Sequence, residues 1–170
     1  MKKYWWLLLA TCAALSGCGG SSTSSSTSVG SQCSLKNEAE CIGADLSGQD
    51  LSGMTMVGID LRNANLSDTT FVGADLTQAN LVGADLTGAD LTGSTLVRIS
   101  LSSANAQGAN FSGALLTGAD FREANIADAN FSRAYLTDAI FTGALNAPSF
   151  EQALLCKTEL PDGKVASPSC

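Results

Sequence analysis

The chain has 170 residues, with 16 acidic and 9 basic side chains, a net charge of −7 and no histidine. One domain is expected at this length. An acidic chain is poorly suited to bind nucleic acid or an anionic surface by charge, so no nucleic-acid partner is expected.

Residues 1–17 have the order of a secretory signal peptide, with two lysines, a short apolar run and then small residues. The apolar run is shorter than the about 20 residues that span a bilayer. LSGC at residues 15–18 resembles the lipobox of bacterial lipoproteins. The resemblance implies that Cys18 carries lipid and becomes the mature N-terminus; the alternative is an ordinary signal peptide with a chance cysteine.

Residues 18–32 comprise this cysteine and a segment of almost only Ser, Thr and Gly, whose composition is typical of a flexible tether. The lipoprotein resemblance implies a lipid-anchored protein of the bacterial cell envelope that contacts the membrane through its N-terminal lipid. Gly19, rather than Asp, follows the cysteine, and in Gram-negative lipoproteins this implies sorting to the outer membrane.

Twenty unbroken pentapeptides follow over residues 44–143. The central residue is Leu in twelve and Phe in five; Ala lies two positions before it in fourteen, and Asp or Asn directly before it in thirteen. On an α-helix a period of five slips by about 140° per repeat, and on a straight strand an odd period alternates between faces. The chain must therefore bend in every repeat to keep the centres inside.

The motif A-(D/N)-(L/F)-x-x resembles the pentapeptide-repeat proteins. The resemblance implies an all-β fold, a right-handed quadrilateral β-helix with four repeats per coil and about five coils, over residues 44–148. Residues 33–43 and 149–170 are expected to form small caps at its two ends. In the first coil Gln49, Met54 and Ile59 replace the inward Ala, so a wider or looser cross-section is expected there.

The four cysteines outside the signal peptide lie in these end segments. Export favours disulfides, and pairing within each cap predicts Cys33–Cys41 and Cys156–Cys170; free thiols or other pairings are the alternative. A capping-box spacing at Ser149 predicts a short helix through Leu155, with Phe150 and Leu154 over the last coil. LPDG at residues 160–163 predicts a turn.

The sequence predicts no enzyme, metal site or cofactor, because it has no histidine and its Asp residues are spread by the repeat instead of gathered in a cleft. The outward Asp and Asn are interpreted as corner residues that cap turns, with a cation ladder as the alternative.

Three outward positions are apolar, all near the C-terminal end: Leu115, Tyr135 and Ile140. Four-repeat coils stack the first two and place Ile140 round the next corner. The alternatives are a cover formed by residues 149–170, a docking surface for an unknown protein partner or a second copy, or tolerated sequence drift. The predicted function is a lipid-anchored envelope scaffold or interaction module. The alternatives are a DNA mimic that binds gyrase, as in the resembled family, and a binder of ice or carbohydrate lattices.

Overall fold

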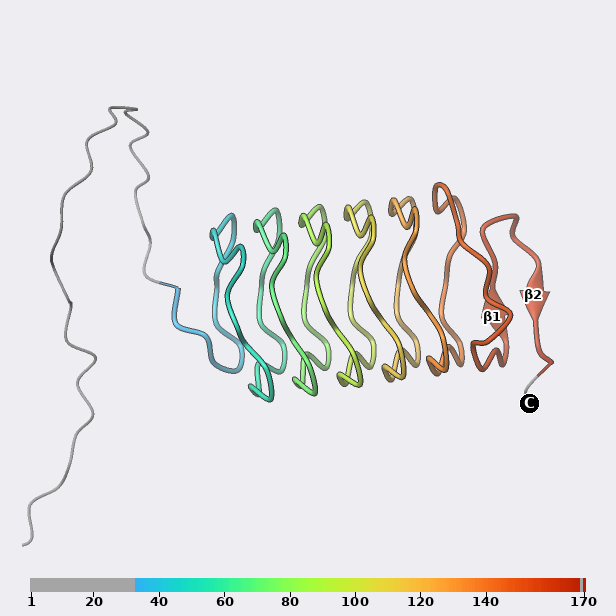
Figure 1. Cartoon of the computed structure of the whole chain (residues 1–170), viewed down its shortest axis with the longest axis horizontal. Helices are drawn as coiled ribbons and strands as arrows, with labels where there is room; N and C mark the ends of the chain where they lie inside the picture. Colours follow the sequence, from blue (N-terminus) through green and yellow to red (C-terminus); the bar gives the residue numbers. More distant parts are fainter. Residues whose placement is uncertain (1–32, 169) are drawn as a thin grey trace, which may run out of the picture.

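The computed structural model describes residues 33–168 and 170, which wind into a four-sided β-helix of stacked coils (Figure 1). Isolated parallel bridges join residues twenty positions apart, such as Asp45 to Asn65 and Asn65 to Asp85. Twenty residues are four pentapeptides, so one repeat forms each side of a coil. The β-helix implied by the resemblance to pentapeptide-repeat proteins is confirmed, and so is the bend in every repeat that the period of five requires.

The bridges form one ladder on each side of the helix. We name the ladders by their first residues: Glu40 (Glu40, Asp60, Asn80, Ser100, Asp120, Ile140, Glu159), Asp45 (Asp45, Asn65, Asp85, Asn105, Asn125, Leu145), Asp50 (Asp50, Thr70, Asp90, Asn110, Asn130) and Thr55 (Thr55, Asp75, Thr95, Leu115, Tyr135, Leu154). The ladders thus begin before residue 44 and continue past residue 148.

The corners explain the period of five. In every repeat the residue two positions after the centre has a positive φ, as at Gly88 (+68°) and Asn63 (+56°). The next residue donates its N–H to the carbonyl of the centre, as from Ala84 to Leu81 (3.1 Å). A positive φ at the third residue of such a turn defines type II and favours glycine, which has no Cβ to clash. A short extended piece and one turn make up each repeat.

The core is built from the repeat centres, whose exposed fractions range from 0% to 6% across all twenty. Most of the Ala residues two positions earlier are buried beside them. In the first coil Ile59 is fully buried, Met54 is half-buried and Gln49 is exposed. Two buried hydroxyls replace Ala farther along, and each donates to a backbone carbonyl: Thr69 to Leu46 (2.9 Å) and Ser94 to Leu91 (2.7 Å).

Phenylalanine fills the C-terminal half of the core. Phe111 stacks on Phe131 with ring centroids 5.0 Å apart, and Phe121 stacks on Phe141 at 4.7 Å. The two stacks meet edge to face, with 5.5 Å between Phe111 and Phe121. Phe150 adds a fifth ring, 4.9 Å from Phe141.

The short helix expected from Ser149 through Leu155 is absent, and that prediction is wrong. The Ser149 hydroxyl oxygen accepts the N–H of Glu151 (3.3 Å), and a tight turn closed by the N–H of Ala153 and the carbonyl of Phe150 (2.9 Å) leads to the bridge at Leu154. Leu154 donates its N–H to Ala134 (2.9 Å). The open edge of the preceding coil supplies backbone partners that one helical turn lacks. Phe150 packs over the last coil as expected, whereas Leu154 faces outward.

The chain ends in an antiparallel pair, β1 (Thr158–Glu159) and β2 (Val165–Ala166). The expected turn over residues 160–163 joins them, with the N–H of Gly163 bonded to the carbonyl of Leu160 (2.9 Å). Glu159 also pairs with Ile140, so β1 continues the Glu40 ladder.

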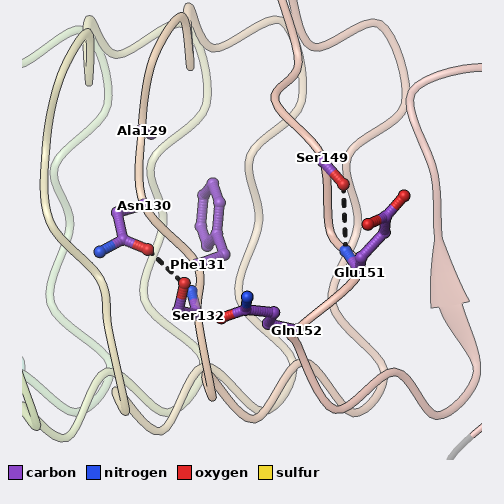
Figure 2. A pocket seen from close by; sticks show the side chains of 7 residues that line it. All are labelled: Ala129, Asn130, Phe131, Ser132, Ser149, Glu151 and Gln152. Carbon is purple, nitrogen blue, oxygen red and sulfur yellow. Dashed lines mark hydrogen bonds between the residues drawn. The ribbon is translucent and has the colours of Figure 1, made fainter.

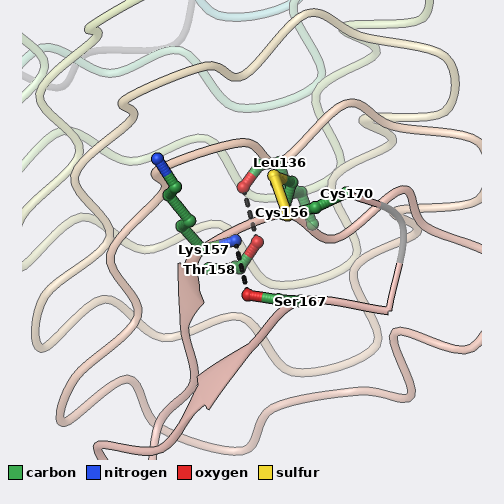
Figure 3. The surroundings of a disulfide bond; sticks show 6 residues. All are labelled: Leu136, Cys156, Lys157, Thr158, Ser167 and Cys170. Atoms are coloured by element: carbon green, nitrogen blue, oxygen red, sulfur yellow. Dashed lines mark hydrogen bonds between the residues drawn. A yellow bond between two sulfur atoms is a disulfide. The ribbon is translucent and has the colours of Figure 1, made fainter.

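The structure contains two disulfides, one toward each end of the described chain: Cys33–Cys41 and Cys156–Cys170, each with 5.0 Å between its Cα atoms. These are the pairs expected from the sequence. Figure 3 shows the second beside Thr158, whose buried hydroxyl donates to the carbonyl of Leu136 (2.6 Å). The last segment is therefore fixed to the helix by covalent and polar contacts.

Candidate functional site

Outward Asp and Asn side chains hold the corners of the helix. Asp85 Oδ1 accepts the backbone N–H of Thr87 (3.0 Å) and its hydroxyl (2.6 Å). The same contact to the N–H two residues on is made by twelve ladder residues in all: Asp45, Asp50, Asp60, Asn65, Asp75, Asn80, Asp85, Asp90, Asn110, Asp120, Asn125 and Asn130. These carboxylates and amides serve the turns, as interpreted from the sequence.

Amides also bond along the ladders. Asn105 Nδ2 donates to Asp85 Oδ1 (3.2 Å), and Asn125 Nδ2 donates to Asn105 Oδ1 (2.9 Å). Asn130 Nδ2 donates to Asn110 Oδ1 (3.1 Å). Carboxylates stacked about 5 Å apart would repel, and an amide between them replaces repulsion with a hydrogen bond.

Two aspartates on the Glu40 ladder form ion pairs. Arg62 Nη2 lies 2.7 Å from Asp60 Oδ2, and Arg122 Nη2 lies 2.6 Å from Asp120 Oδ2. The hydrogen bonds from these guanidinium groups lower the pKa of both aspartate carboxyls. Each pair lies within one repeat, so the side chains support the corner that they share.

The Thr55 ladder becomes apolar toward its C-terminal end. Three successive rungs are occupied by Leu115, Tyr135 and Leu154, whose exposed fractions are 40%, 47% and 41%. We call these three residues the apolar column. The structure therefore stacks Leu115 on Tyr135, as expected, and places Ile140 half-buried on the neighbouring side. The C-terminal tail does not cover the column but supplies its third member.

The place of Leu154 in the apolar column was missed from the sequence, because Leu154 lies nineteen residues after Tyr135, outside the regular repeats. The only signal in the sequence is the apolar pair Leu154-Leu155, which lies in a tail without further repeats. One of the two leucines had to face outward in an extended chain.

Basic side chains flank the apolar column. The described residues include seven Lys and Arg, of which three form ion pairs within one repeat or turn. Three of the other four lie on the corners beside the column: Arg98, Arg133 and Lys157, all exposed. The Arg98 side chain lies against Gly118 of the next coil, and its Cγ is 3.3 Å from the position that a Cβ on Gly118 would occupy. Asp138 lies on one of these corners and Glu151 lines the neighbouring pocket, so the surroundings carry a small positive excess on an acidic protein.

The predicted lipid site, Cys18, lies outside the described residues, as do the whole of the expected signal peptide and the whole of the expected tether. Within residues 33–168 and 170, no three His, Cys, Asp or Glu side chains are arranged to hold a metal ion. The same part of the chain has no helix of the length and apolarity that a membrane span requires.

Several solved structures are similar to this chain. A pentapeptide repeat protein (Rfr23) from the cyanobacterium Cyanothece 51142 is 26% identical; the match covers 59% of this chain and 85% of that one, with a TM-score of 0.49. The pentapeptide repeat protein alr5209 from Nostoc is 36% identical, with coverage of 56% and 74% and a TM-score of 0.36. A pentapeptide repeat protein of the Arabidopsis thaliana thylakoid lumen is 31% identical, with coverage of 62% and 71% and a TM-score of 0.31. No curated protein sequence matches significantly.

The model of a protein family described as pentapeptide repeats in eight copies matches residues 39–78, 79–118 and 114–144, more than half of the chain. Proteins of this family fold as right-handed quadrilateral β-helices and are generally non-enzymatic structural or interaction proteins. The chain belongs to the pentapeptide-repeat family.

Proposed function

We propose that the chain is a non-enzymatic interaction module, anchored by lipid at Cys18 to the outer membrane of a bacterial cell envelope. The lipobox-like residues 15–18 support the anchor. The Asp side chains support a non-enzymatic role, because the turns and ion pairs already use many of their carboxylate oxygens. In this proposal residues 18–32 form a tether about 20 Å in typical reach.

The apolar column is the observation that carries the interaction role. Three large exposed side chains in successive rungs form a contiguous apolar strip, whereas isolated exposed apolar residues are normal on any protein. Arg98, Arg133 and Lys157 beside the strip favour a partner whose docking surface combines apolar and acidic side chains.

We also infer that residues 33–43 and 149–170 cap the two ends of about five coils. At the first end, the N–H groups of Glu38 and Cys41 bond to the carbonyls of Val57 (2.8 Å) and Asp60 (2.7 Å). At the other end, Phe150 covers the rings of Phe131 and Phe141. Each cap is closed by its own disulfide, so neither depends on the other.

The anchor is tested by Cys18→Ser. The variant should lose lipid labelling and move from the membrane fraction to the soluble fraction of the envelope. Cys12→Ser is the matched control, because Cys12 lies within the proposed signal peptide and its loss should change neither property. Membrane retention of Cys18→Ser with unchanged lipid labelling would show that the lipobox interpretation is wrong.

The interaction surface is tested by Tyr135→Asp in envelope crosslinking. A charge at the middle rung should abolish the crosslinked partner band without unfolding the helix, because Tyr135 is nearly half exposed. Thr55→Asp is the control, since Thr55 is exposed on the same ladder but remote from the column. An unchanged band for Tyr135→Asp, or equal loss for both variants, would exclude the column as the docking surface.

A further inference from the structure

One side of the last coil is a residue short. On the Asp45 ladder Asn125 pairs with Leu145, twenty residues on, but on the Thr55 ladder Tyr135 pairs with Leu154, only nineteen residues on. The chain therefore loses one residue between these two rungs. The side that lies between them carries the Asp50 ladder, which ends at Asn130 without a further bridge in the described chain. Pro148 lies in the shortened segment and has no N–H to give to a ladder.

The shortening leaves one rung of backbone unpaired. Nineteen of the twenty repeat centres donate their N–H to a carbonyl of the next coil, as Phe111 does to Asn130 (2.8 Å). Phe131 is the exception: its N–H has no acceptor within the described residues. The carbonyl of Ala129 likewise has no donor there, whereas the carbonyl of Ala109, one coil earlier, accepts the N–H of Asn130 (2.9 Å). Phe131 is 2% exposed, and buried backbone groups are almost always paired.

A pocket of about 250 Å³ lies at this gap. Figure 2 shows Asn130 and Ser132 on one side and Ser149, Glu151 and Gln152 on the other, with Phe131 between them. The pocket is thus bordered by the open ladder edge and by the shortened segment that fails to fill it.

We propose that this gap is a docking site for an extended peptide of a partner protein, which supplies the missing rung. In every completed rung one residue bonds twice to the preceding coil: its N–H donates to a carbonyl there, and its own carbonyl accepts the N–H of a repeat centre. Asn130, for example, donates to the carbonyl of Ala109 and accepts the N–H of Phe111. One residue of an extended peptide can therefore bond to both Ala129 and Phe131, which is strand addition at a sheet edge. The proposal deepens the interaction role and rests on it only for the existence of a partner.

The side chains select an asparagine at that rung and a basic residue near it. Asn110 Oδ1 accepts both the N–H of Ser112 (3.1 Å) and the Nδ2 of Asn130 (3.1 Å). Asn130 Oδ1 accepts only the N–H of Ser132 within the described residues (3.0 Å), so it can accept an amide donor from an incoming asparagine. Glu151 lines the pocket and forms no ion pair in the described chain, which favours a lysine or arginine beside that asparagine.

The test uses the full chain in detergent micelles, labelled with ¹⁵N-phenylalanine. The chain has six Phe, all within the described residues, so six amide signals are expected, and Phe131→Leu identifies the one from Phe131. The probe is the blocked peptide acetyl-Lys-Ala-Asn-Ala-Lys-amide. Its titration should shift the Phe131 signal saturably and slow the hydrogen exchange of that amide, while the amide of Phe111, already bonded, should not change.

Two controls tie the shift to the missing rung. A peptide methylated on the backbone nitrogen of its asparagine cannot donate to Ala129 and should not bind. Asn130→Ala should weaken binding by roughly 2- to 12-fold, the equivalent of one net hydrogen bond, whereas Asn80→Ala on another side should have no effect.

A Phe131 amide that exchanges fast but does not respond to the peptide would overturn the proposal, because water alone would then complete the rung. Equal binding of the methylated peptide would overturn it as well. Neither outcome would affect the membrane anchor, which Cys18→Ser tests separately.

Discussion

Leu116 and Leu115 are adjacent in the chain, yet the structure assigns them opposite environments. Leu116 is a repeat centre with 0% exposure, and Leu115 belongs to the apolar column with 40% exposure. The same change to Ala at both positions therefore compares inward with outward burial directly. Leu116→Ala should destabilise by about 2–5 kcal/mol, from the lost burial of three carbon atoms and from the cavity that remains. Backbone ladders on four sides limit relaxation into that cavity, which favours the upper half of the range.

Leu115→Ala removes a side chain that borders solvent and leaves no enclosed cavity, so about 1 kcal/mol is expected. Urea unfolding followed by circular dichroism would measure both variants against the parent chain. A repeat array can unfold in segments, so the slopes of the transitions should be compared before their midpoints. Equal destabilisation by the two substitutions would refute the inward–outward assignment on which the description of the surface depends.

Three further perturbations probe the polar and covalent contacts. The pKa values of Asp60 and Asp120 are lowered in the folded chain. The stabilisation from both carboxylates is therefore fully present above an ordinary Asp pKa of about 3.9 and is lost as the pH falls through the folded pKa values. The melting temperature should be level near neutral pH and fall below about pH 4. Asp120→Asn should make that fall less steep, and an unchanged profile would contradict the role of the Arg122 pair. Chemical reduction of the Cys156–Cys170 disulfide, whose cysteines are 14 residues apart, should lower the free energy of unfolding by about 3 kcal/mol. The loss should appear as a lower urea midpoint with reductant, and a chain with both Cys156→Ser and Cys170→Ser should show no such reductant effect from this end. Gly88→Ala should lower the free energy of unfolding by roughly 1–2 kcal/mol, because Gly88 has a positive φ and the Asp68 carboxylate oxygen would lie 2.5 Å from the new Cβ. Asn63→Gly, at the equivalent position of another repeat, should be nearly neutral in the same urea assay.

The regular part of the fold follows from the sequence because one geometric requirement repeats twenty times. Each centre must return to the axis, and only a bend in every repeat allows this, so the inward residues, the corner Asp and Asn and the stacking of Leu115 on Tyr135 could all be predicted. The end segments lack the repeated motif, so the structure of each residue there has to be predicted from local signals alone. At Ser149 a local capping signal favoured a helix, but the open edge of the preceding coil offered hydrogen bonds that an isolated turn cannot match.

The gap at Phe131 could not be predicted either, because it depends on the number of residues between two successive rungs of the last coil. A motif shows where repeats occur, but residues 146–157 lack it, and nothing local shows whether nine or ten residues separate the rungs at Leu145 and Leu154. The first coil is a milder case. Gln49 and Met54 are tolerated in the place of Ala because they lie toward the end of the helix, where their side chains reach solvent.

The one-residue shortening links the two candidate surfaces. With a spacing of twenty, Leu155 would pair with Tyr135 and face outward; with nineteen, Leu154 takes that rung and Leu155 is buried at 9% exposure. A shift of one residue exchanges the faces of an extended chain, so the shortening decides which leucine joins the apolar column, and it also leaves the N–H of Phe131 without an acceptor in the described chain. The column and the gap lie on adjacent sides of the same coil, and Arg133 joins them through its N–H bond to the carbonyl of Gln152 (2.8 Å). A partner strand that enters the gap would therefore emerge beside Tyr135, and its apolar side chains could cover the column. On this basis Tyr135→Asp should weaken capture of the natural partner but leave the Phe131 response to the short lysine–asparagine peptide intact, because that peptide lacks large apolar side chains. Loss of both responses without unfolding would mean that the two surfaces are one site.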